Sequence, residues 1–193
     1  MLESTGRYEV HLTRHNDTYL RLYKRVDFAR NKKADLFISL HADSIGKSNV
    51  RGASIYTLSE KASDAQTARL AERENRADLI AGVDLSHEDE QVANILVDLA
   101  MRDTMNQSNF FAGTLLDRMR SSNIRILEKP LRHAGFAVLK APDVPSVLIE
   151  IGFMSNKYEA EQLARPAYRD QIGRALVSGI DSNFEKIRRN QRL

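Results

Sequence analysis

Two ionisable side chains stand in stretches of sequence that are otherwise apolar. Glu150 interrupts the run from Val147 to Phe153, and His41 ends a run that begins at Leu36. Burying an ionised carboxylate without a partner is very costly, so a glutamate in such a strand needs a metal, a cation or a catalytic task. Apolar surroundings also raise the pKa of a carboxyl group toward the range of a general base. Together the two residues indicate a metal-dependent hydrolase, with His41 as a metal ligand and Glu150 as the proton shuttle.

Each of these residues also has a purely structural interpretation. A lone histidine such as His41 is more often a hydrogen-bonded core residue than a metal ligand. Glu150 could stand at the end of its strand and face solvent. The residue types alone leave both interpretations open.

The strands that carry His41 and Glu150 are predicted from short, nearly unbroken apolar runs. The run at 36–42 is bounded by polar residues, which is typical of a strand buried on both faces of a parallel sheet. His41 then lies at the carboxyl end of its strand, where open α/β sheets gather their ligand sites. Glu150 lies in a second predicted strand, at 146–153. Further strands are predicted at 8–14, 53–58 and 136–139.

Helices are predicted between and after these strands. Asp17 is the predicted cap of a helix whose apolar stripe runs from Tyr19 to Ala29. A last helix carries apolar residues at near-helical spacing from Ile172 to Ile187. The order strand, helix, strand, strand predicts an α/β fold, with a mixed, mostly parallel sheet flanked by helices.

The composition changes between residues 59 and 122. The stretch 63–77 is rich in alanine and charge, which predicts a helix with a narrow apolar stripe. Ser86 is the predicted cap of a long helix that continues, or restarts after Ser108, toward Ser122. No repeat or low-complexity linker separates these parts. We therefore predict one domain, residues 1–193, with a helical insertion at about 59–122.

Composition excludes several classes of function. The chain has no cysteine, which rules out disulfides, thiolate zinc sites and cysteine nucleophiles. Its formal charge of +3 is concentrated in the tail at 186–192, and no basic stripe is interleaved with aromatic residues. A nucleic-acid-binding module is thus a weak hypothesis, and we expect no nucleic-acid partner. No stretch has the length of a membrane span, and the first residues lack the apolar segment of a signal peptide.

Five blocks of the chain resemble the zinc-dependent N-acetylmuramoyl-L-alanine amidases, the cell-wall amidases that separate daughter cells. The resemblance spans nearly the whole chain, and its last block is the most specific. The blocks are Thr13–Asp17, Arg25–Ala29, Ser39–Asp43, Val138–Pro142 and Pro145–Asn156.

The resemblance implies a zinc enzyme that hydrolyses peptidoglycan, with His41 as a zinc ligand and Glu150 as the catalytic base. Residues 59–122 are similar to the regulatory segment of the Gram-negative periplasmic members, in which a helix lies across the active site and a glutamate can bind the zinc. Glu74 matches that glutamate best, and an exposed helix charge is the alternative interpretation. A periplasmic location, and an activator protein that acts on this segment, are implied in the same way.

Two motifs of the family have no counterpart in this sequence. The family begins with a strand followed by Asp-Pro-Gly-His-Gly-Gly, whose histidine binds zinc, and a later glutamate binds it too. His11, His15 and His133 do not stand at those positions. The rival hypothesis is therefore a catalytically inactive peptidoglycan-binding or regulatory protein that keeps the fold.

These departures lead to two expectations about the chain. The sheet should lack the family's first strand. Without that strand, four apolar residues should lack a packing partner: Leu36, Ile38, Val147 and Ile149. The chain alone should carry little zinc and show little amidase activity, because affinity comes from a preformed cluster of ligands.

Overall fold

A four-stranded mixed sheet forms the centre of the protein. The computed structural model describes residues 1–80 and 94–190. Its strands are β1 (Phe37–His41), β2 (Ala53–Leu58), β3 (Ile126–Ala134) and β4 (Ser146–Glu150), arranged in the order β1-β4-β2-β3. β1 pairs with β4 and β2 with β3 in parallel, whereas β2 and β4 are antiparallel. The predicted α/β class with a mixed, mostly parallel sheet is confirmed.

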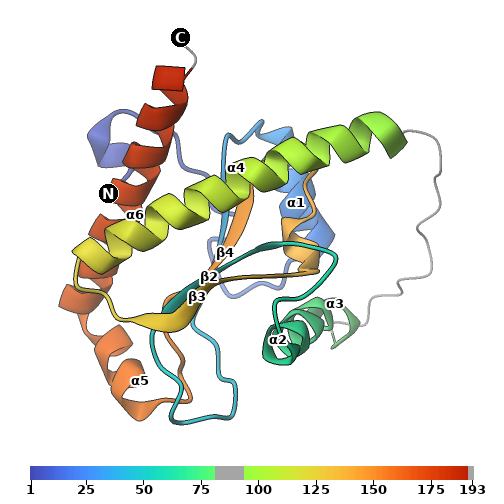
Figure 1. The fold of residues 1–193 in the computed structure, drawn as a ribbon. Coiled ribbons are helices and arrows are strands. Elements are labelled where there is room, and N and C mark those ends of the chain that lie inside the picture. The colour runs from blue at the N-terminus through green and yellow to red at the C-terminus, as the bar shows by residue number, and fades with distance from the viewer. Residues whose placement is uncertain (81–93, 191–193) are drawn as a thin grey trace.

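Helices cover both faces of this sheet (Figure 1). On one face, α4 (Asn94–Ser121) and α6 (Pro166–Asn190) pack with Val147 and Ile149 of β4, and α5 (Lys157–Ala164) lies at the edge of this layer. On the other face, α1 (Leu22–Asn31), α2 (Ala65–Asn75) and the short helix η2 (Ala137–Leu139) pack around Leu148. Successive residues of β4 therefore enter opposite cores, as the period of two of a strand requires.

The predicted strand at 8–14 is wrong, because this segment has no regular secondary structure. Tyr8 and His11 of this segment contact helices instead of a neighbouring strand. The Tyr8 ring lies 5.8 Å from that of Phe184, and its hydroxyl donates to Asp181 Oδ1 at 2.6 Å. His11 stacks edge-on against Phe28 of α1, with ring centroids 6.4 Å apart.

The strand predicted at 136–139 is also wrong, because these residues form the turn of η2. The sheet takes its edge strand from β3, whose sequence contains three basic residues and Pro130 and gives no strand pattern. Proline lacks the backbone N–H of a sheet ladder and is tolerated at an edge strand. The pairing of β2 with β3 shifts register between Ala53 and Ile55, which is consistent with such an irregular edge.

Helix α1 begins at Leu22, and Asp17 does not cap it. The cap comes from Asp78 of α3 (Ala77–Ile80), far along the chain. The Leu22 backbone N–H donates to Asp78 Oδ1 at 3.0 Å, and the Tyr19 hydroxyl donates to the same oxygen. Asp78 is only 6% exposed. This contact fastens α3 to the start of α1.

Helix α4 runs without a break past Ser108, and its second half belongs to the main core. Phe111, Leu115 and Met119 have no exposed surface. The predicted cap at Ser86 lies outside the described residues. The helix predicted at 63–77 is present as α2, capped by Asp64, which accepts from the Thr67 backbone N–H.

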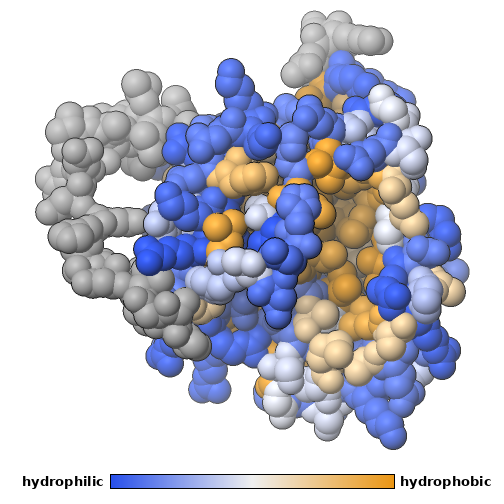
Figure 2. Space-filling view, turned by 180° about the vertical axis from the view of Figure 1, so that it is seen from behind, coloured by the Kyte–Doolittle hydropathy of each residue, from blue (hydrophilic) through white to orange (hydrophobic). Residues whose placement is uncertain are grey.

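Strand β1 lies at one edge of the described sheet and is less buried than its apolar sequence predicts. Leu40 is 55% exposed, and Leu36 and Ile38 are half-buried. Val147 and Ile149 are fully buried, so the expectation that they would lack neighbours is wrong: β4 is flanked by β1 and β2. The view from behind shows hydrophobic residues gathered in a hollow of the surface (Figure 2). No described helix combines the length and apolar character needed to cross a membrane.

Candidate active site

His41 and Glu150 meet at one end of the sheet. Each is the last residue of its strand, and the two are paired directly across the parallel β1–β4 ladder. Because parallel strands end at the same edge, two polar side chains far apart in sequence become neighbours there. His41 lies at the carboxyl end of its strand, as predicted. Glu150 was predicted inside a strand at 146–153, but β4 ends at Glu150.

Glu150 is a buried carboxylate with one free oxygen. Its side chain has no exposed surface. Oε1 accepts a hydrogen bond from the Asp43 backbone N–H at 2.8 Å, and Oε2 has no partner among the described residues. Burial, with the nearby charge of Asp43, raises the pKa of Glu150 to about 9. A buried oxygen without a partner is costly to maintain, so it marks a position where a proton, a ligand or a cation belongs.

His41 is held between its own strand and Asp43. Nε2 lies 3.0 Å from Ser39 Oγ, and Nδ1 lies 3.3 Å from Asp43 Oδ1. One ligand atom from each of His41, Asp43 and Glu150 can be chosen so that all three lie within 4.8 Å of one another. Sequence reasoning gave Asp43 no role, although its place two residues after a strand end was a usable signal.

Helix α2 adds a third carboxylate, Glu74, to this cluster. Glu74 Oε2 lies 3.6 Å from His41 Nδ1. Its neighbour Arg73 donates from Nη2 to Asp43 Oδ2 at 2.7 Å and from Nη1 to the Ser44 carbonyl at 2.6 Å. The structure therefore brings together the three residues singled out from the sequence, His41, Glu74 and Glu150. Arg73, which fastens α2 to the loop after β1, was missed.

The cluster contains more carboxyl groups than cationic groups. Burial acts to raise the pKa of Asp43, but His41 and Arg73 outweigh it and hold that pKa below its usual value. Burial and the charge of Asp43 raise the pKa of Glu74, although His41 and Arg73 act in the opposite direction. Carboxyl groups that resist ionisation because they are buried, and because they lie close to another carboxylate, are the groups that a cation would stabilise in their ionised form.

This donor set fits a divalent metal. An imidazole nitrogen and carboxylate oxygens are ligands that zinc accepts, and Oε2 of Glu150 has no partner among the described residues. Ser39 holds the far nitrogen of His41, which is the kind of contact that orients a ligating histidine. His11, His15 and His133 are exposed and take no part in the cluster.

A second buried glutamate shapes the backbone around the site. Glu159 of α5 is 6% exposed. Its Oε1 accepts from the Gly52 backbone N–H and its Oε2 from the Phe153 backbone N–H, both at 2.7 Å. These bonds tie the start of β2 to the segment that follows Glu150. Sequence reasoning missed this residue, because its position in the first turn of a helix after Asn156 is equally typical of a surface charge.

The chain is similar in sequence to known proteins over nearly its whole length. A family model described as N-acetylmuramoyl-L-alanine amidase matches residues 1–182. The chain is 38% identical over 177 residues to AmiA of Escherichia coli K12, covering 91% of this chain and 61% of that protein. It is 34% identical over 185 residues to AmiC of Escherichia coli O6:H1, covering 95% of the chain and 44% of that protein. The chain thus spans less than two thirds of the length of these curated relatives.

Solved structures share the fold. The catalytic domain of CwlV from Bacillus (Paenibacillus) polymyxa var. colistinus superposes with a TM-score of 0.60 at 23% identity, covering 95% of this chain and 76% of that one. CwlD from Clostridioides difficile, solved in complex with the GerS lipoprotein, gives a TM-score of 0.60 at 18% identity, covering 95% and 79%. At these identities the likeness is one of fold.

Proposed function

Since the chain belongs to the N-acetylmuramoyl-L-alanine amidase family, we propose that it hydrolyses the amide bond between N-acetylmuramic acid and L-alanine in peptidoglycan. The observation that carries this proposal is the buried Oε2 of Glu150, which has no described partner, on a residue paired with His41 across the sheet. A general base must be within reach of the proton that it abstracts, and a free carboxylate oxygen at the end of a strand meets that requirement.

The proposed metal is zinc, held in this part of the chain by His41 and, while α2 lies over the site, by Glu74. When bound, zinc supplies Lewis acidity, which polarises a carbonyl group and lowers the pKa of a neighbouring water. Ser39 orients His41 from the side of Nε2, and the backbone N–H of Asp43 fixes Oε1 of Glu150. Because Oε1 is occupied by this hydrogen bond, Oε2 is the oxygen of Glu150 that is available to move the proton.

In the proposed reaction, Oε2 of Glu150 takes a proton from the attacking water and passes it to the nitrogen of the leaving L-alanine. Burial raises the pKa of Glu150 to about 9, so without a nearby cation its carboxyl group is protonated at neutral pH and cannot act as a base. A cation beside it lowers that pKa and keeps the carboxylate ionised for the first transfer. The same residue then returns the proton as a general acid.

The direct test of the activity is digestion of purified peptidoglycan at saturating zinc, because the chain alone is expected to hold little of the metal. We expect release of peptides that begin with a free L-alanine amine, with the glycan strands left intact. Cleavage within the glycan strand, or no soluble peptide from folded and zinc-saturated protein, would contradict the proposed reaction and favour the inactive wall-binding alternative.

His41→Ala tests the metal site. Because the imidazole is the only nitrogen ligand in the described cluster, we expect its removal to weaken zinc binding at least about tenfold. Competition with a chromophoric chelator measures the affinity. His133→Ala, an exposed histidine on β3, is the matched control and should leave the affinity unchanged. Equal zinc affinity in both variants would remove His41 from the site.

We further propose that α2 and α3 form a regulatory cover over the site. This cover is shorter than the insertion at 59–122 that the sequence predicts. The second half of α4 is core, whereas α2 is fastened over the cluster by Arg73 and α3 is fastened to α1 by Asp78. Glu74 would then occupy a position that water or substrate needs. An activator protein would act by displacing this cover, and the complex of CwlD with GerS is a precedent for a partner in the same fold.

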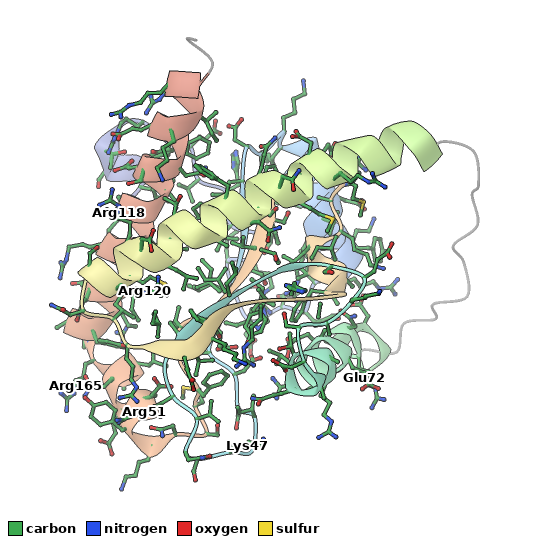
Figure 3. The ribbon with its side chains drawn as sticks, viewed as in Figure 1. Lys47, Arg51, Glu72, Arg118, Arg120 and Arg165 are labelled. Carbon is green, nitrogen blue, oxygen red and sulfur yellow. The ribbon has the colours of Figure 1, made fainter. Side chains whose placement is uncertain are left out.

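Glu74→Ala tests the cover. We expect basal turnover of peptidoglycan to rise several-fold, because the variant removes the carboxylate 3.6 Å from His41 and leaves the Arg73 contacts to Asp43 and Ser44 in place. Glu72→Ala, on the outer side of α2 (Figure 3), is the control. Basal turnover that is unchanged or lower in a folded Glu74→Ala protein would argue against autoinhibition.

A periplasmic location and a role in daughter-cell separation complete the proposal. They come from the resemblance to Gram-negative amidases, with AmiA and AmiC of Escherichia coli among the relatives. Localisation of an epitope-tagged form by cell fractionation is the corresponding measurement.

A further inference from the structure

A pocket of about 530 Å³ lies between the end of α4, helix α5 and the start of α6. Its other walls are Arg51, which precedes β2, and the turn before β3. None of the described residues that line it belongs to α2 or α3, so displacement of the proposed cover leaves its walls in place. Arg51 and Arg120 of this pocket lie on the side of the molecule away from Glu72 of α2 (Figure 3).

This pocket is close to the end of the sheet that carries the candidate active site. Ser54 of β2 pairs with Glu150 across the antiparallel β2–β4 ladder. Arg51 precedes Ser54 by three residues, which is at most about 11 Å of chain. A polymer held at Glu150 can therefore reach the pocket with a neighbouring unit.

The pocket has a surplus of positive charge. Arg120 pairs with Asp117 at 3.1 Å, whereas Arg51 and Arg125 form no ion pair with a described residue. The lining contains one carboxylate among its described residues, Glu159, and both of its oxygens are occupied by backbone N–H groups. Guanidinium groups bind carboxylates through paired hydrogen bonds, so this surplus suits a ligand with a carboxylate.

Tyrosine rings and amide side chains form the rest of the polar lining. The Tyr158 ring is 55% exposed, and the Arg51 guanidinium lies over it, 5.5 Å from its centroid. Tyr168 is half-buried, and Gln162 and Asn123 add amide groups that can both donate and accept. A sugar ring presents C–H groups on its faces, which pack on tyrosine, and hydroxyls at its edge, which bind amides. The lining thus matches a sugar that carries a negative charge.

We propose that this pocket binds a sugar of the glycan strand that carries a free carboxylate. The identity of this ligand rests on the proposed amidase function. In that hydrolysis the oxygen of water joins the carbonyl carbon, the carbon–nitrogen bond breaks, and L-alanine leaves with the proton. The lactyl group of N-acetylmuramic acid is left as a carboxylate, whereas an uncleaved strand has a neutral amide there.

Arg51 and Arg125 bind this carboxylate, and Tyr158 packs on the face of the sugar. The pocket therefore distinguishes a strand that has lost its peptides from one that still carries them. Because the pocket is within reach of the candidate active site, the enzyme is retained on a strand from which it has already released peptides.

The test compares two sugars that differ at one group, N-acetylmuramic acid and its lactyl amide. Each is titrated, without added zinc, into the 193-residue protein labelled with ¹⁵N, and the arginine Nε–H signals are followed by NMR. We expect the acid to bind at least about tenfold more tightly, which is the range of a charge-assisted hydrogen bond. We also expect it to shift the signals of Arg51 and Arg125.

Four variants assign the preference to the pocket. Arg51→Gln and Arg125→Gln break no ion pair to a described residue, and each should lower the preference for the acid severalfold with the fold intact. Tyr158→Ala should weaken the binding of both sugars, because it removes the ring on which either would pack. Arg165→Gln changes an exposed arginine after α5 that does not line the pocket (Figure 3), and it should bind both sugars like the unchanged protein.

Equal binding of the acid and the amide would overturn the inference, as would a titration in which neither Arg51 nor Arg125 shifts. A preference that survives in both glutamine variants of the pocket would also overturn it, because the sugar would then bind elsewhere. The same holds if D-lactate or inorganic phosphate binds as tightly as N-acetylmuramic acid, since the pocket would then recognise charge without the sugar.

The binding measurement requires no hydrolysis, so the two proposals can fail separately. A preference for the acid without release of peptides from peptidoglycan would contradict the proposed function alone. Release of peptides without such a preference would contradict this inference alone.

Discussion

Glu150→Gln is expected to lower the rate of peptidoglycan hydrolysis by at least about a hundredfold, the usual contribution of a general base. Glutamine has the same shape and can still accept from the Asp43 backbone N–H, which now donates to Oε1 at 2.8 Å. It cannot take up a proton at the position of Oε2, the atom that has no described partner. The rate should fall while the fold is retained.

Three measurements on this variant separate the chemical role of Glu150 from a structural one. Circular dichroism and thermal melting report the fold, a zinc titration reports the metal site, and release of L-alanine-terminated peptides reports turnover. Glu72→Gln, an exposed glutamate on α2, is the matched control and should match the unchanged protein in all three. A Glu150→Gln protein that keeps most of its turnover would show that another group moves the proton.

Glu159→Ala is expected to give the largest loss of stability, roughly 3–5 kcal/mol in the free energy of unfolding. Glu159 is 6% exposed, and both of its oxygens accept backbone N–H groups, from Gly52 and Phe153. Removing the carboxylate leaves two buried donors without a partner, each of which carries a desolvation cost. For a chain of this size, the midpoint of thermal unfolding should fall by on the order of 10 °C.

Glu161→Ala on the same helix is the control, because Glu161 is exposed and should tolerate the change. Urea unfolding followed by circular dichroism measures both variants. Glu159→Gln keeps the volume but turns one acceptor into a donor that faces a backbone N–H, so it should also be destabilised. Equal stabilities for the alanine variants at 159 and 161 would show that the two backbone contacts of Glu159 contribute little to the fold.

Three strands of the sheet, and the two candidate site residues His41 and Glu150, could be predicted from local sequence pattern. β1, β2 and β4 are short apolar runs. Because exposing such runs to water is unfavourable, they are expected to be buried as strands in the core. The same argument marked Glu150 as anomalous, because an acid among aliphatic residues has to be explained by its environment. His41 and Glu150 were thus identified before their contact was known.

Local pattern failed where a segment takes its conformation from distant partners. The alternating residues around Tyr8 fit a strand, yet this segment has no regular secondary structure, and the Tyr8 ring packs against Phe184 of α6. Conversely, β3 is a strand although its sequence is polar and contains Pro130. A strand exists only through the neighbour that pairs with it, and an edge position relaxes the demand for apolar residues. The start of α1 is similar, because its cap is Asp78 and not Asp17.

The sequence was therefore sufficient for the α/β class, the buried strands and the identity of the acid and the histidine, since each follows from hydrophobic burial along a few consecutive residues. Tertiary structure alone decided which side chains join them. Asp43 and Arg73 join the cluster because a loop and a helix are folded over the end of the sheet, and Glu159 turns inward to two backbone amides. Glu74 was matched to the site by resemblance, and the same helix carries it to His41. Hydrogen bonds and ion pairs depend on distances between atoms that are remote along the chain, and such distances are not written in any local pattern.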